Sequence, residues 1–118
     1  MSTLIQLVDP ALRQLMLRME NKFSEMMQEA SKALLKINEA QTPTEMQERD
    51  YLQALVNETA KSIVSMNEFA NLEVEPGVTD EEFLAENKVM LETYRQQLTQ
   101  DLERATELIS QQKALAMN

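Results

Sequence analysis

Residues that form turns are almost missing from this sequence, which has one glycine and three prolines in 118 residues. β-Sheets and loop-rich folds need many tight turns, and those turns depend on the backbone freedom of glycine and the fixed φ angle of proline. Glutamine, glutamate, methionine, leucine and alanine, which all favour helices, fill much of the remaining chain. The sequence therefore predicts an all-α protein with a few long helices and few connections.

Three short segments carry the signals of helix starts. Asp9 before Pro10 is an N-cap residue followed by proline at the first helical position. Residues 42–45 repeat that pattern and add a glutamate that completes a capping box. Residues 72–79 contain the only glycine and end at Thr79, which starts a second capping box. We therefore predict a single domain over residues 1–118, with helices over about residues 10–40, 43–71 and 80–116.

Each predicted helix has an apolar seam with the alternating three- and four-residue spacing of coiled coils. The three seams consist of Leu12, Met16, Met19, Phe23, Met26, Ala30, Ala33 and Ile37; of Leu52, Val56, Thr59, Ile63, Met66 and Ala70; and of Leu91, Leu98, Leu102, Ala105 and Ile109. Further apolar residues widen each seam enough to contact two neighbours. Because both connections are short, consecutive helices should be antiparallel. We predict an up-down-up bundle of three long helices.

The predicted third helix is longer than the second. At 1.5 Å per residue it should extend roughly 12 Å beyond the turn between the first two helices. This overhang begins near Leu108 and carries Ile109, Leu115 and Met117. An apolar patch without cover usually marks an interface. The alternative is a frayed terminus.

An apolar segment also precedes the first helix. It consists of Leu4, Ile5, Leu7 and Val8. These residues either cover Leu72, Val74 and Val78 in the second connection or extend the first helix by one or two turns.

Several kinds of chemistry lack the residues that they need. There is no cysteine and no histidine, which removes thiol nucleophiles, disulfides, zinc sites and histidine acid–base pairs. Residues 71–82 have some of the spacing of a calcium loop, but Pro76 stands where the loop needs glycine. We interpret this segment as an acidic connector. The sequence predicts a non-enzymatic protein with no cofactor and no metal site.

The net charge of −9 should repel nucleic acid and anionic lipid. A basic partner would meet the acidic second and third helices, although the acidity also serves solubility alone. No apolar run is long enough for membrane insertion, and the N-terminus lacks the basic and apolar regions of a signal peptide. Together with the absence of cysteine, this favours a cytoplasmic location.

The leading hypothesis is a small chaperone, adaptor or assembly subunit that binds an amphipathic helix of another protein in an apolar groove. The predicted contact residues lie off the main seams or near the end of the third helix: Met27, Leu34, Leu108, Ile109, Leu115 and Met117. Met27 belongs to a methionine-rich face, which can adapt to varied partners. The alternatives are an acidic inhibitor or nucleic-acid mimic that occupies a basic site, and a self-assembling helical protein that forms a homo-oligomer.

Overall fold

The computed structural model describes residues 2–37, 39 and 41–117, with side-chain burial up to residue 114. This part of the chain contains five helices: α1 (Leu4–Leu7), α2 (Pro10–Lys36), α3 (Pro43–Ala70), α4 (Asp80–Glu86) and α5 (Lys88–Met117). Its one β-type pairing is an isolated bridge between Thr3 and Glu73. The predicted all-α class is confirmed.

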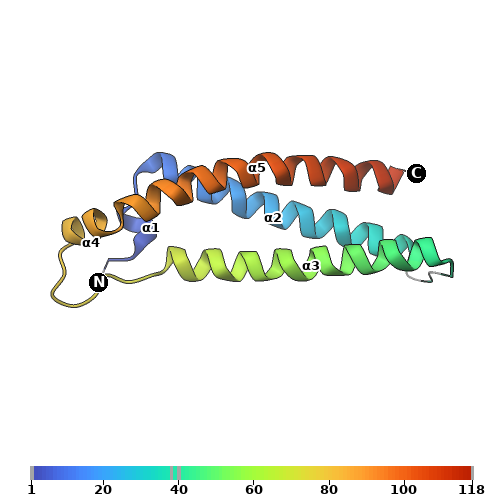
Figure 1. The fold of residues 1–118 in the computed structure, drawn as a ribbon, viewed down its shortest axis with the longest axis horizontal. Coiled ribbons are helices and arrows are strands. Elements are labelled where there is room, and N and C mark those ends of the chain that lie inside the picture. Colours follow the sequence, from blue (N-terminus) through green and yellow to red (C-terminus); the bar gives the residue numbers. More distant parts are fainter. Residues whose placement is uncertain (1, 38, 40, 118) are drawn as a thin grey trace.

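The three long helices lie alongside one another in an elongated molecule (Figure 1). The chain runs along α2, returns along α3, and then runs along α5 in the direction of α2. Helix α2 packs against both α3 and α5, whereas α3 and α5 have no comparable packing with each other. The predicted bundle, in which each helix would contact two neighbours, is therefore only partly formed. One side of α2 is left between two helices that stand apart.

The N-caps of α2, α3 and α4 are where the sequence predicts them. The side chains of Asp9, Thr42 and Thr79 accept hydrogen bonds from the backbone amides three residues further on, at 2.9, 3.1 and 3.1 Å respectively. Each bond satisfies one of the amides that have no partner within the first turn of a helix. These local bonds explain why the helix starts are readable from the sequence.

The third predicted helix is interrupted at Asn87, which separates α4 from α5. The Asn87 side-chain amide donates to the Phe83 carbonyl at 2.8 Å, and the backbone amide of Asn87 donates to the same oxygen at 3.1 Å. Asparagine competes in this way with the regular helix ladder. The expectation of one continuous helix over residues 80–116 is corrected accordingly.

The expected overhang of the third helix is also absent. Two ion pairs set α5 against α2, Asp9 with Arg95 and Glu25 with Lys113, the second at 3.2 Å. Helix α5 ends at Met117, near the end of α2, and does not extend beyond the α2–α3 connection, as Figure 1 shows. The additional length lies at the opposite end, in α4.

The N-terminal segment closes that opposite end of the molecule. The amide of Leu4 donates to the Leu72 carbonyl at 2.8 Å, and the amide of Val74 donates to the Ser2 carbonyl at 3.0 Å. Leu4, Val8 and Val74 are buried in the same core cluster, which confirms that this segment covers the second connection. The cover is incomplete, because Leu72 remains 46% exposed.

The core has two parts. The larger one contains the buried residues Leu4, Val8, Leu12, Met16, Met19, Met26, Val74, Phe83, Leu98, Ala105 and Ile109. The smaller one, at the α2–α3 connection, contains Ala30, Ala33 and Leu52. The three predicted seams supply most of these residues, so the heptad spacing identifies the core correctly.

Candidate functional site

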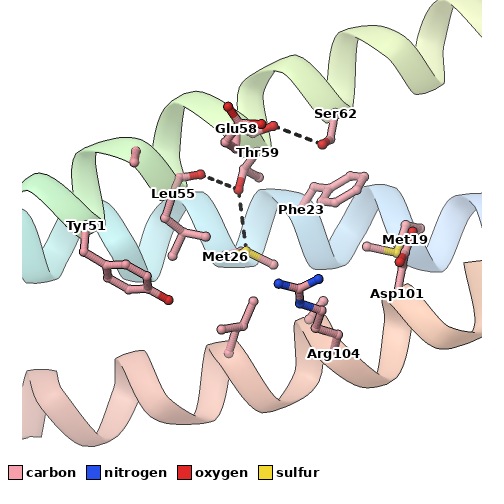
Figure 2. A pocket seen from close by; sticks show the side chains of 13 residues that line it. Met19, Phe23, Met26, Tyr51, Leu55, Glu58, Thr59, Ser62, Asp101 and Arg104 are labelled. Atoms are coloured by element: carbon pink, nitrogen blue, oxygen red, sulfur yellow. Dashed lines mark hydrogen bonds between the residues drawn. The ribbon is translucent and has the colours of Figure 1, made fainter.

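A groove lies over α2 between α3 and α5, along the stretch where those two helices are not packed against each other. It consists of two adjoining hollows with volumes of about 470 and 460 Å³. Both hollows are lined by Met19, Phe23, Glu58, Ser62 and Asp101, so they form one continuous feature. Figure 2 shows the larger hollow, with side chains entering from all three long helices.

The floor of the groove is apolar. It is built from the α2 seam residues Met19, Phe23 and Met26, with Leu55 of α3 and Leu108 of α5 at the sides. Met19 and Met26 are almost fully buried, whereas the other three are half-buried. Among the α2 residues of the floor, Phe23 is therefore the one that the chain's own helices leave partly uncovered.

The one buried polar side chain of the floor is Thr59, which is 4% exposed. Its hydroxyl lies 2.7 Å from the Leu55 carbonyl of its own helix and 3.5 Å from the sulfur of Met26. Figure 2 shows both contacts. Because the hydroxyl is satisfied within the chain, Thr59 does not require a polar partner from an occupant of the groove.

The rim of the groove is polar and carries charges of both signs. Glu58 forms an exposed ion pair with Lys61 at 3.7 Å, and Asp101 accepts a hydrogen bond from Gln97 at 3.0 Å. Arg104, in contrast, has no ion-pair partner among the described residues. An apolar floor between polar rims is the usual arrangement of a surface that binds an amphipathic helix.

The two ends of the groove differ. One end is closed by Phe69 and Tyr94, whose ring centroids are 4.5 Å apart. Burial raises the pKa of the Tyr94 phenol, and the Asp101 carboxylate raises it further. The other end is open, because α5 stops before the α2–α3 connection. Between Tyr51 and Phe69 the α3 wall is about 27 Å long, which matches a helix of about five turns.

The predicted contact residues fall in different places. Leu108 lines the groove, but Ile109 is 4% exposed and belongs to the main core, because the expected overhang does not exist. Ile109 is therefore corrected from an exposed contact to a core residue. Leu34 is half-buried and lines a separate hollow beside Leu35, and Met27 is half-buried and lines neither of these hollows. The side chains of Leu115 and Met117 lie outside the described residues.

Sequence reasoning missed most of the groove. Phe23, Met26 and Thr59 lie in the predicted seams, and Met26 and Thr59 are buried as that prediction requires, whereas Phe23 is half-buried and lines the groove. Residues that line a groove have the same spacing as residues that face a helix. Tyr51, which is 51% exposed and lines the groove, adjoins the buried seam residue Leu52. The available signal was Thr59, since a polar residue in an apolar seam is unusual in a closed core.

The described residues contain no group of three or more acidic side chains suited to hold a metal ion. Within the same part of the chain, no helix has the length and apolar character needed to cross a membrane. The chain matches no family model, no curated protein and no solved structure.

Proposed function

We propose that this chain is a non-enzymatic interaction protein, a small chaperone, adaptor or assembly subunit, whose groove binds one amphipathic helix of another protein. The observation that supports the proposal is the apolar seam of α2 facing a hollow between α3 and α5. A fourth helix in this position would convert the open arrangement into a four-helix bundle. The site needs no catalytic group for this role.

The shape and chemistry of the groove fit such an occupant. A helix presents its apolar residues at positions i, i+3, i+4 and i+7, and these would meet Phe23, Met26 and Leu55 on the floor. The methionines can adjust to side chains of different shape, because their thioether chains are flexible. Burial of apolar surface would stabilise the complex by about 25 cal/mol per Å². A cytoplasmic location and the absence of a nucleic-acid partner stay predictions.

The experiment is a selection from a displayed library of amphipathic helical peptides of about 18 residues, the length of the groove. We expect the wild-type protein to enrich peptides that bind it. Ala54→Trp should abolish the enrichment, because Ala54 is exposed and lines the groove, so a large ring there occupies the space without changing the core. The matched control is Ala11→Trp, at an exposed position of α2 that does not line the groove.

Circular dichroism of all three proteins should show the same helicity. Failure of the wild-type protein to enrich any peptide would sink the proposal. Equal enrichment by wild type and Ala54→Trp would place the binding surface elsewhere. Binding that weakens steeply with salt would instead support the alternative of an acidic protein that occupies a basic site.

A further inference from the structure

Arg104 is the one charged side chain of the larger hollow that has no polar or charged partner among the described residues. It projects from α5 into the hollow, as Figure 2 shows. Two acidic residues, Asp101 and Glu107, lie one turn away from it on the same helix. Pairs at this spacing often form on helices. Arg104 nevertheless lies beyond ion-pair distance of both, which leaves its guanidinium available to an occupant of the groove.

An occupant would change the surroundings of this guanidinium. A helix that covers the groove removes water from the floor and from the side chains that project over it. A guanidinium that loses water without gaining a partner is costly, whereas a carboxylate can accept two parallel hydrogen bonds from it. The other charges of the hollow already have partners within the chain, Glu58 with Lys61 and Asp101 with Gln97. Arg104 is therefore the charged side chain of the hollow that still needs a partner from an occupant.

We infer that the helix bound in the groove carries an aspartate or glutamate at the edge of its apolar face, on the side of α5 and level with Arg104. This inference rests on the proposed function of the groove and specifies the chemistry of the partner. It also separates two electrostatic effects. The net charge of −9 acts over distance and favours basic partners overall, but that field is screened beyond about 8 Å at physiological ionic strength. The pair with Arg104 forms in contact and sets the register of the helix.

The test uses the same peptide library, with an apolar stripe held constant and the positions beside it randomised. Wild-type protein should enrich Asp or Glu at one edge position. Arg104→Glu should enrich Lys or Arg at that same position. The matched control is Arg18→Glu, which makes the same change of charge at an exposed site of α2 outside the groove, and it should give the wild-type preference.

A double-mutant cycle then measures the pair directly. Replacing the enriched acidic residue by its amide should weaken binding to wild type about tenfold, as expected for a charge pair that loses water. The same peptide change should have little effect on binding to Arg104→Gln. Circular dichroism of each variant checks that the helices are intact.

The possible results separate the two proposals. Enriched peptides that compete with one another and are blocked by Ala54→Trp, but that show no acidic preference, would overturn the inference while keeping the groove. No enrichment at all would overturn the proposed function itself. Sedimentation provides the remaining outcome: a wild-type dimer that becomes a monomer with Ala54→Trp would show that a second copy fills the groove, and the inference would then be wrong.

Discussion

The two ends of this molecule are built on similar amphipathic helices, but different elements cover the apolar seams of those helices at each end. At the closed end, formed by α1, residues 71–79 and α4, the buried residues Leu4, Val8 and Val74 are supplied by segments outside the long helices. At the open end, formed by the last turns of α2 and the first turns of α3, the buried cluster consists of Ala30, Ala33 and Leu52, which all belong to the long helices themselves. Both ends leave apolar residues exposed: Leu35 is 77% exposed at the open end, and Leu72 is 46% exposed at the closed end.

This difference shows what an apolar seam needs in order to become a core. The seam of α2 runs through both ends with the same spacing, so the helix itself does not determine the burial. The covering elements determine it. A short helix and a connection complete the closed end, whereas α5 does not extend over the α2–α3 connection and stands apart from α3 over the groove. If this is so, substitutions at the closed end should lower the free energy of unfolding, and substitutions in the groove should change the binding of a partner helix.

The largest loss of stability should come from Leu4→Ala. Leu4 has no exposed surface, and its side chain joins the N-terminal segment to the main core. Removing it leaves a cavity, and we expect a loss of about 2–4 kcal/mol in the free energy of unfolding. The measurement is urea unfolding followed by circular dichroism.

The control for this prediction is Leu17→Ala, at a leucine that is 52% exposed on α2. It should change stability by less than about 0.5 kcal/mol. Equal effects of the two substitutions would mean that the closed end contributes no more to stability than the surface of α2, and the comparison would fail.

A smaller loss should follow from Gly77→Ala in the connection of the closed end. Gly77 has a φ of +86°, and the amide of Val78 donates to the Glu75 carbonyl at 3.1 Å, so residues 75–78 form a turn that needs a residue with positive φ. A Cβ atom at Gly77 would meet no atom within 4 Å. The cost is therefore that of the backbone alone, about 1–2 kcal/mol. Unfolding in urea measures it, and an unchanged midpoint would show that the connection does not need this turn.

The two ion pairs between α2 and α5 should have small effects at both ends. We expect Asp9→Asn and Glu25→Gln each to lower stability at pH 7 by less than about 1 kcal/mol, because water still reaches both carboxylates: the Asp9 side chain is 50% and the Glu25 side chain 36% exposed. Asparagine keeps the N-cap of α2, so Asp9→Asn removes only the charge. Similar small effects would show that the two ends differ in apolar cover and not in electrostatics. A loss of several kcal/mol at either position would contradict this.

The pH dependence of these pairs has a defined sign. The hydrogen bond from Arg95 lowers the pKa of Asp9 below its ordinary value of 3.8, and the hydrogen bond from Lys113 lowers the pKa of Glu25 below 4.5. A lowered pKa in the folded state stabilises the fold above the ordinary value and loses that effect as the pH falls through the lowered one. Thermal melts at pH 7 and pH 3 should therefore show a smaller difference between wild type and each variant at pH 3.

Local signals in the sequence were sufficient for the helix starts and for most of the core. Asp9, Thr42 and Thr79 form their caps with residues only three positions away, so no distant contact is needed to predict them. The break at Asn87 could not be predicted with the same certainty. Asparagine is tolerated within many helices, and the sequence alone does not show that the side chain of Asn87 bonds to the Phe83 carbonyl where α4 ends.

The groove and the end of α5 depend on how helices are placed against one another. The pairs Asp9–Arg95 and Glu25–Lys113 join residues 86 and 88 positions apart, and they set how far α5 reaches along α2. The local sequence pattern of α2 or of α5 does not predict how the two helices are aligned along their length. For the same reason the sequence predicted Ile109 as a partner contact although it is buried in the core, and it did not identify Phe23 as a residue of the groove.

The smallest predicted effect concerns Thr59, the polar residue in the floor of the groove. Its hydroxyl donates to the Leu55 carbonyl, an oxygen that already lies within the hydrogen-bond ladder of α3, so replacing Thr59 by valine leaves no buried donor without a partner. The two side chains have the same shape and similar helix propensity, and we expect Thr59→Val to change stability by less than about 0.5 kcal/mol. Peptides selected on the wild-type groove should bind the variant with unchanged affinity, as measured by fluorescence anisotropy. A clear loss of affinity would mean that the hydroxyl turns outward to the bound helix, and the floor of the groove would then select its occupant through Thr59 as well as through Arg104.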